Sequence, residues 1–248
     1  MELRAPARMR REQVAARDHR HGRMAAALRL TGGALAIWTL LSVIGLILTH
    51  VFSKGSVHSA DLGVDVWLAR HRTRTWNSVM LFGTDLARTE TVIGVAVIAA
   101  LILRWRLKRW RESLIVVLAV AGEVLIFLAV TETVPQRRPP VPRLQVAPAP
   151  SSFPSGHTAA AVALYGCLAI LLLVLWAGHP AARVMAAVLF CIPVYVGASR
   201  LYEGEHYPSD VLAGALLGGL WLFCLLRTVP PGAGARRAER RQAVPVSR

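Results

Sequence analysis

The feature that most constrains the fold of this chain is a series of long apolar runs with few or no charged residues. A helix needs about 20 apolar residues to cross the hydrocarbon core of a bilayer. Six runs approach or reach this length, at residues 30–52, 91–103, 113–134, 158–176, 183–198 and 208–226. Backbone polar groups in lipid must be bonded within their own segment, so we expect these runs to be helices. The predicted fold is therefore all-α, a polytopic membrane protein with six transmembrane helices.

The overall composition agrees with this prediction. Hydrophobic residues make up 54% of the chain, charged residues only 17%, and the mean hydropathy is +0.46. A typical soluble domain is about 25% charged. The second run is the weakest candidate, because a helix through it reaches the length of a full span only if it also includes one or two turns around Asp85, Arg88 and Glu90. The fifth run contains Pro193, where we expect a kink.

The arginines predict the orientation of the chain. Eight lie before residue 30, five Lys and Arg lie in residues 104–111, and six Arg follow residue 226. Because basic residues favour the cytoplasmic side, we expect an integral plasma-membrane protein with both termini cytoplasmic and an extracytoplasmic active site. The predicted organisation is a cytoplasmic Arg-rich tail (1–29), a membrane domain (30–226) and a disordered basic cytoplasmic tail (227–248).

The net charge of +15 does not indicate nucleic-acid binding, because the basic residues lie in the tails and short loops and do not form a continuous basic surface on a folded domain. We expect these segments to contact anionic lipid. The oligomeric state is left open.

Two connecting segments have distinctive patterns. Residues 57–77 mix apolar and charged positions, as an interfacial amphipathic helix does, although a solvated loop fits nearly as well. Residues 135–154 are rich in proline and are expected to form an extended loop.

Three polar clusters adjoin the apolar runs, and the predicted topology places all of them at the outer membrane surface. Residues 136–139 (Gln-Arg-Arg-Pro) follow the third run, and residues 154–157 (Pro-Ser-Gly-His) begin the fourth. The third cluster, Ser-Arg-x5-His-x3-Asp over residues 199–210, joins the fifth run to the sixth. We expect these clusters to form one site.

The residues of this site suit the binding of a phosphate group. Ser155 precedes a helical run, where its hydroxyl can cap the helix, and Gly156 lets the backbone approach an anion. Arg138 and Arg200 each offer a planar guanidinium that matches phosphoryl oxygens. These four residues are the predicted phosphate-binding shell.

The third cluster also supplies a nucleophile and its partner. Pro208 suits the first position of the last helix, which places Asp210 in the first turn, near His206. The carboxylate can keep one imidazole nitrogen protonated and leave the other free to attack phosphorus. His157 remains as the acid that protonates the leaving group. The predicted catalytic residues are therefore His206, Asp210 and His157.

These clusters resemble the three-part signature of the type 2 phosphatidic acid phosphatase superfamily: Lys-x6-Arg-Pro, Pro-Ser-Gly-His and Ser-Arg-x5-His-x3-Asp. That superfamily also includes polyprenyl-diphosphate phosphatases and vanadium haloperoxidases. The second and third parts are complete, and the first retains Arg138 and Pro139. Where the signature has its lysine, this chain has Thr131. The resemblance covers residues 30–226.

The resemblance implies hydrolysis of a lipid phosphate through a phosphohistidine intermediate, with no metal and no cofactor. The implied substrates are a polyprenyl diphosphate such as undecaprenyl diphosphate, phosphatidic acid or phosphatidylglycerol phosphate. Arg137 and Arg143 are candidates to compensate for Thr131. A lipid phosphotransferase with the same residues and a non-enzymatic lipid-binding or scrambling protein are the alternatives. A haloperoxidase is not expected to have six lipid-facing spans.

Other polar residues allow two interpretations. Glu123, near the middle of the third run, is either functional or a structural carboxyl bonded to a neighbouring helix. Tyr202 and Tyr207 fit an interfacial aromatic belt better than a headgroup pocket. Glu203 and Glu205 are candidates to adjust the charge beside the site.

Overall fold

The structure is a computed structural model that describes residues 7–51, 55–145, 151–176 and 178–232, and these residues form helices and loops without a strand. The helices are α1 (Ala7–His50), α2 (Ser56–Arg70), α3 (Arg74–Asp85), α4 (Thr89–Leu107), α5 (Arg111–Thr133), α6 (Gly156–Ala161), η1 (Val162–Gly166), α7 (Cys167–Leu175), α8 (Pro180–Tyr202) and α9 (Pro208–Thr228). The prediction of an all-α fold is confirmed.

Five helical segments of the described chain are long and apolar enough to cross a membrane. Four of them are α5, the continuous α6–η1–α7 segment, α8 and α9, and the fifth is His21–His50 of α1. The pair α3 and α4 passes the same test as one span, although the two helices are bent by 50°. Counted in this way, the structure has the six predicted spans.

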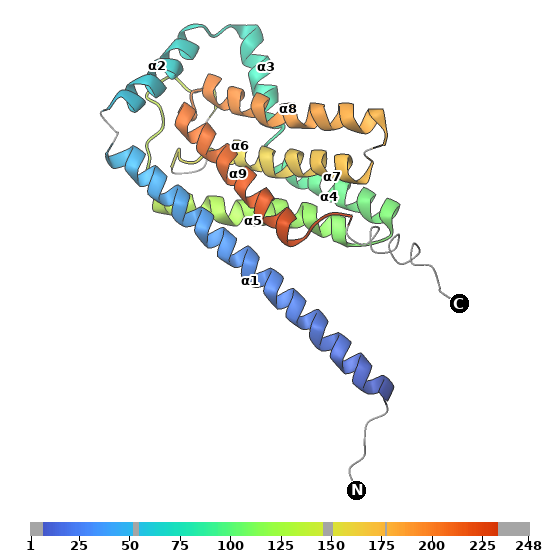
Figure 1. The fold of residues 1–248 in the computed structure, drawn as a ribbon. Coiled ribbons are helices and arrows are strands. Elements are labelled where there is room, and N and C mark those ends of the chain that lie inside the picture. Colours follow the sequence, from blue (N-terminus) through green and yellow to red (C-terminus); the bar gives the residue numbers. More distant parts are fainter. Residues whose placement is uncertain (1–6, 52–54, 146–150, 177, 233–248) are drawn as a thin grey trace.

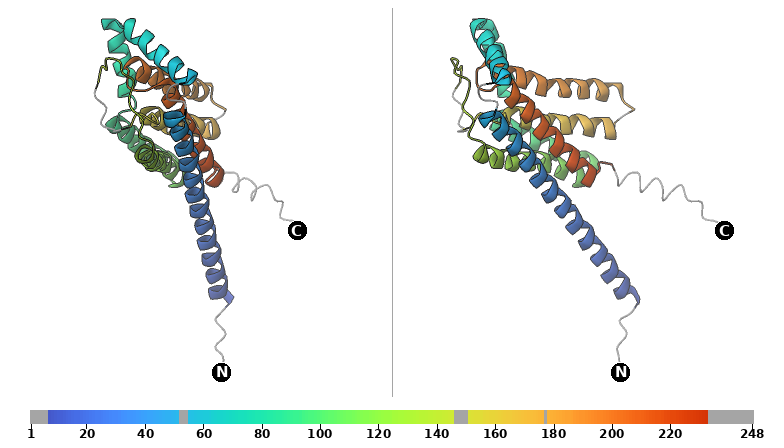
Figure 2. Two further views of the ribbon diagram at one scale, coloured as in Figure 1. Left: turned by 90° about the vertical axis from the view of Figure 1, so that its left-hand side faces the viewer. Right: turned by 60° about the vertical axis from the view of Figure 1, so that its left-hand side comes forward.

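The helices form a bundle in which each cluster-bearing loop reaches the same end (Figure 1). Helix α4 packs against α5, α6 against α9, and α1 crosses both α5 and α9. The N-terminal half of α1 projects beyond the bundle in every view (Figures 1 and 2). The predicted boundary at residues 29 and 30 lies inside this continuous helix.

Helices α2 and α3 cover one end of the bundle. The segment 57–77, predicted as an amphipathic helix or a loop, contains α2 and the start of α3, which are separated by a non-helical turn at residues 71–73. Helix α2 packs against α8 and α9. The residues expected to extend the second span form the bend between α3 and α4, where Arg88 and Asp85 are paired at 3.3 Å. Pro193 lies inside α8, which runs without a break to Tyr202. Charged groups therefore lie in the bend and at the two ends of α4, and residues 91–103 between them carry no charge.

Close helix contacts set the position of α9. The indole Nε1 of Trp221 donates to the Leu118 carbonyl of α5 at 3.0 Å. Nearer its start, α9 approaches the turn before α6, where the Ser155 backbone N–H donates to the Asp210 carbonyl at 3.0 Å. The beginning of α9 is thus fixed against the beginning of α6, which joins two of the predicted clusters.

The segment between α5 and α6 is an extended loop in its described parts, as its prolines predict. The predicted disordered tail begins at residue 227, but α9 continues to Thr228. Residues 233–248 lie outside the described residues, so the disorder expected there stays a prediction.

Candidate active site

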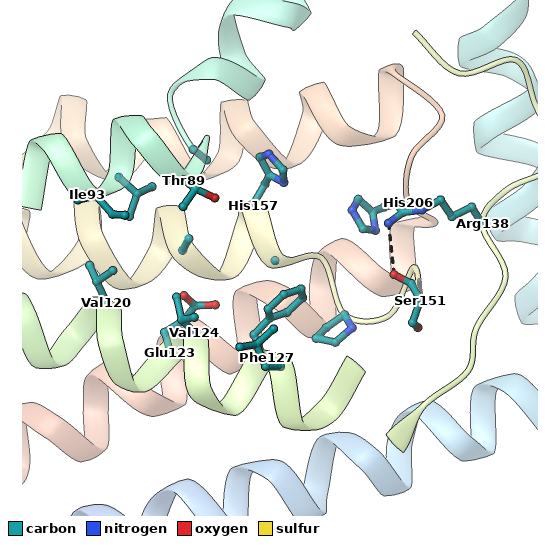
Figure 3. A pocket seen from close by; sticks show the side chains of 16 residues that line it. Thr89, Ile93, Val120, Glu123, Val124, Phe127, Arg138, Ser151, His157 and His206 are labelled. Atoms are coloured by element: carbon teal, nitrogen blue, oxygen red, sulfur yellow. Dashed lines mark hydrogen bonds between the residues drawn. The ribbon is translucent and has the colours of Figure 1, made fainter. Parts of the chain in front are cut away.

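The three clusters meet beside a cavity of about 350 Å³ at one end of the bundle. Among the predicted site residues, Arg138, Gly156, His157 and His206 line this cavity. Figure 3 shows the two histidines near one another and the Arg138 side chain reaching toward them from the loop after α5. Sequence positions 138, 157 and 206 are therefore neighbours in space.

The tautomer of His206 follows from its hydrogen bond. Its Nδ1 lies 2.7 Å from the Ser152 carbonyl oxygen. A carbonyl oxygen only accepts, so Nδ1 carries the proton and donates it, and Nε2 keeps its lone pair. Burial lowers the pKa of His206 well below its usual value, and the charges of Arg200 and Arg138 lower it further. His206 is therefore a neutral imidazole with the protonation state of a nucleophile.

Asp210 does not bond directly to His206. Its Oδ2 lies 3.8 Å from Nδ1, beyond hydrogen-bond distance. The same oxygen accepts from the Ser152 hydroxyl at 2.6 Å and from the Tyr207 backbone N–H at 3.0 Å. Ser152 thus connects Asp210 to His206, since its hydroxyl donates to the carboxylate and its carbonyl accepts from the imidazole.

Two residues of this arrangement had no role in the sequence analysis. Ser152 lies just before the Pro-Ser-Gly-His cluster, and no motif pattern distinguishes it. Gln136 belongs to the first cluster, and its Nε2 donates to Asp210 Oδ1 at 2.9 Å. Both oxygens of the carboxylate are therefore held, and the first cluster is tied to the third.

The two predicted phosphate-binding arginines belong to a buried network with two glutamates. Arg138 Nη1 lies 3.1 Å from Glu205 Oε2, and Arg200 Nη2 lies 3.8 Å from the same oxygen. Arg200 Nη1 donates to Glu203 Oε2 at 2.8 Å. The glutamates fix the guanidinium groups and balance their charge, which agrees with the charge-adjusting role considered for them.

Arg200 is less accessible than the motif predicts. Its side chain is 2% exposed and it is absent from the residues that line the cavity. Its Nε is buried without a hydrogen-bond partner among the described residues. A phosphate that used Arg200 would have to enter deeper than the open part of the cavity.

Ser155 and Gly156, two residues of the predicted phosphate-binding shell, are only partly available to a ligand. Ser155 is the N-cap residue of α6, but its hydroxyl pairs with the Thr158 hydroxyl at 3.0 Å and does not cap the backbone. Gly156 lines the cavity, and a β-carbon there would lie 2.8 Å from the Phe127 ring. A side chain at this position would therefore require the Phe127 ring to move.

Neither Thr131, which stands in place of the signature lysine, nor the two arginines proposed to compensate for it lines the cavity. Thr131 is buried, and its hydroxyl has no partner among the described residues. Arg137 and Arg143 are exposed and do not line the cavity, although the Arg143 charge acts on Arg138. Arg88, in the bend between α3 and α4, acts electrostatically on His157. It is a further cation that motif reasoning did not select.

A family model described as the PAP2 superfamily matches residues 112–232. Phosphatidylglycerophosphatase B of Bacillus subtilis (strain 168) is 30% identical over 185 residues, covering 73% of this chain and 89% of that protein. This chain belongs to the PAP2 superfamily. The family predicted from the three clusters is confirmed.

Other PAP2 relatives are also membrane-lipid phosphatases by name. The undecaprenyl-diphosphatase of Sulfolobus acidocaldarius is 26% identical over 198 residues, covering 76% of this chain and 88% of that protein. The crystal structure of a transmembrane PAP2 type phosphatidylglycerolphosphate phosphatase from Bacillus subtilis matches with a TM-score of 0.67 and 25% identity, covering 85% of this chain and 98% of that chain. The PAP2 fold of an integral membrane protein therefore extends over nearly the whole described chain.

Proposed function

We propose that this PAP2 protein is a membrane lipid phosphatase in which His206 is the nucleophile. The observation that carries the proposal is the neutral His206, with Nδ1 bonded to the Ser152 carbonyl, in a cavity shared with Arg138 and His157. Neutral imidazole is the form that attacks phosphorus, and the guanidinium offers charge-assisted bonds to phosphoryl oxygens. The names of the PAP2 relatives support the same reaction class.

The reaction proceeds in two displacements at phosphorus. In the first, Nε2 of His206 forms a bond to phosphorus as the bond from phosphorus to the lipid oxygen breaks. His157, which lines the same cavity, donates a proton to the leaving oxygen. In the second, water adds to phosphorus, the bond to Nε2 breaks, and His157 accepts the proton of the water. Phosphate and the dephosphorylated lipid are the products.

The wall of the cavity fits a substrate that arrives from the lipid phase. Ile93 of α4 and Leu128 of α5 line the cavity and are 54% and 50% exposed. On a membrane-spanning helix such exposure means contact with acyl chains. A lipid phosphate can thus place its headgroup at the histidines while its tail remains among apolar side chains.

We also propose that the cavity faces the outside of the cell and that both termini are cytoplasmic. The Lys- and Arg-rich connection between α4 and α5 lies at the opposite end of the bundle from the cavity (Figure 1). Basic connections favour the cytoplasmic side.

Phosphate release from purified protein tests the reaction. Wild type is expected to release phosphate from phosphatidic acid, phosphatidylglycerophosphate or undecaprenyl diphosphate, and His206→Ala is expected to lose at least about 1000-fold in kcat. Equal release by the two proteins would contradict the assignment of His206. A labelled acceptor lipid in the same assay separates transfer to water from transfer to another lipid.

A further inference from the structure

Glu123 is a carboxyl group inside the apolar part of the cavity. It belongs to α5, is 1% exposed, and lines the cavity together with side chains such as Val120 and Val124. Figure 3 shows its carboxyl group directed from α5 toward the space beside α6. The interpretation as a structural carboxyl bonded to a neighbouring helix is not supported by the contacts.

Within the described residues the Glu123 side chain has no partner. Its Oε2 is buried without a hydrogen bond, and no described residue forms an ion pair with it. Among the described residues, no charged group acts on it electrostatically. An unpaired carboxyl at this depth costs several kcal/mol unless it is neutral and finds a hydrogen-bonding partner. In the neutral form it offers one O–H donor and one carbonyl acceptor.

The depth of Glu123 relative to the phosphate end can be derived from the helix. Phe127, on the same helix, contacts Gly156 beside His157. Glu123 precedes Phe127 by four residues, which corresponds to about 6 Å along the helix axis. Glu123 therefore lies about one helical turn from the phosphate end, toward the lipid tail.

We propose that Glu123 determines the substrate class by donating a hydrogen bond to an ester carbonyl of a glycerolipid phosphate. The inference rests on the proposed function. In such a lipid the nearest ester carbonyl lies roughly 6 Å from phosphorus, which corresponds to the depth of Glu123. A polyprenyl phosphate has only carbon and hydrogen beyond its bridging oxygen and would leave the carboxyl unpaired. Glu123 thus favours acylated glycerol phosphates over polyprenyl phosphates.

The effect of the ester carbonyl can be isolated by comparing three monophosphates: dioleoyl phosphatidic acid, its dialkyl ether analogue, and a polyprenyl monophosphate. For wild type, kcat/KM for the ester is expected to exceed that for the ether by about threefold to tenfold, the value of one hydrogen bond. The polyprenyl monophosphate is expected to behave like the ether. Glu123→Leu should reduce the ester-to-ether ratio to about one, whereas Glu123→Gln, which keeps a donor, should preserve most of it.

Glu132→Gln is the matched control, because Glu132 lies on the same helix but is exposed and does not line the cavity. It should leave the ester-to-ether ratio unchanged. A ratio of one in wild type, faster hydrolysis of the polyprenyl lipid, or an equal loss for all three lipids in Glu123→Leu would overturn the proposal.

Equilibrium binding of the ester and ether lipids to His206→Ala gives the same ratio without hydrolysis. An ester preference in binding without phosphate release by wild type would contradict the proposed function alone. If Glu123→Leu does not fold, the wild-type ratio and Glu123→Gln still decide the question.

Discussion

At the scale of single residues, the hydrogen bonds around His206 determine which ring nitrogen keeps its lone pair. The Ser152 carbonyl takes the Nδ1 proton, and two arginines disfavour a second proton on the ring. Asp210 acts one step further away, by accepting the Ser152 hydroxyl at 2.6 Å. The carboxylate therefore positions the loop that positions the imidazole.

Substitution of Ser152 tests this connection. Ser152→Ala removes the hydroxyl that bonds Asp210 but keeps the backbone carbonyl that bonds His206. Asp210 then no longer holds that carbonyl in position. Because a hydrogen bond to a charged group contributes about 1.5–3 kcal/mol, we expect kcat to fall about 10- to 100-fold. KM should change little, since Ser152 does not line the cavity. Steady-state kinetics with a lipid phosphate measure both constants.

The control for this variant is Ser209→Ala. In wild type the Ser209 hydroxyl donates to Asp61 at 2.5 Å. Ser209 is next to Asp210 in the sequence but takes no part in the hydrogen bonds that link Asp210 to His206 through Ser152. The kcat of Ser209→Ala should stay within a few-fold of wild type. Equal losses in the two variants would show that any hydroxyl near the start of α9 has the same effect.

A second residue-scale prediction concerns Asp65 in α2. Both of its oxygens are buried without a hydrogen-bond partner among the described residues, and its side chain is fully buried. The pKa of Asp65 is raised from 3.8 to about 8, chiefly by burial and also by the charges of Asp61 and Asp210. The folded protein therefore holds a proton that the unfolded chain releases above about pH 4, and stability decreases as the pH rises from about 4 to about 8.

Asp65→Asn cannot ionise and should lack this decrease. We expect its Tm to exceed that of wild type in detergent by a margin that grows from pH 5 to pH 8. The same change at Asp85, whose side chain is 48% exposed, is the matched control for replacing an aspartate by asparagine. Parallel Tm curves for wild type and Asp65→Asn would refute the burial of an unpaired carboxyl at this site.

At the scale of helices, the contact between α6 and α9 keeps the clusters together. A β-carbon on Gly214 of α9 would lie 2.3 Å from the Ser155 carbonyl oxygen, which is backbone and cannot rotate away. Only glycine allows α9 to approach the Pro-Ser-Gly-His turn so closely. Helix packing and the position of the Pro-Ser-Gly-His turn therefore depend on the same residue.

Gly214→Ala should separate α9 from this turn. We expect a loss of about 1–3 kcal/mol in the free energy of unfolding, together with a lower kcat, because His157 and His206 move apart. Thermal unfolding and phosphate release measure the two effects.

Gly219→Ala is the matched control on the same helix, since a β-carbon there meets nothing within 4 Å. It should be neutral or stabilising by about 0.5–1 kcal/mol. If both alanines behaved alike, the close approach at Gly214 would not limit the packing.

At the scale of the whole molecule, the Lys- and Arg-rich connection between α4 and α5 and the cavity occupy opposite ends of the bundle. His71 is exposed next to Arg72, which donates to the Tyr202 carbonyl at the cavity end. Lys108 is exposed in the connection between α4 and α5 at the other end. Their accessibility reports the orientation in the membrane.

Single cysteines at these positions test the proposed orientation, with Cys167, Cys191 and Cys224 replaced by alanine. A membrane-impermeant maleimide added to intact cells should label His71→Cys at once and Lys108→Cys only after permeabilisation. The reverse pattern would place the cavity on the cytoplasmic side.

The sequence by itself determined the helical spans and the family. Apolar length is a local property that forces a lipid-embedded segment to bond its own backbone. The spacing of Pro-Ser-Gly-His and of Ser-Arg-x5-His-x3-Asp is likewise readable along the chain. Both predictions therefore needed no knowledge of which helices are neighbours.

Only the tertiary structure decided how those residues contact one another. It placed the Ser152 carbonyl, and not Asp210, on Nδ1 of His206, and it gave Arg138 and Arg200 a shared partner in Glu205. It also directed Glu123 into the cavity, where its side chain has no partner within the described part of the chain. The physical reason is that a hydrogen bond forms only when the donor–acceptor distance is correct to within a few tenths of an ångström. Between distant parts of the chain, that distance is set by helix packing.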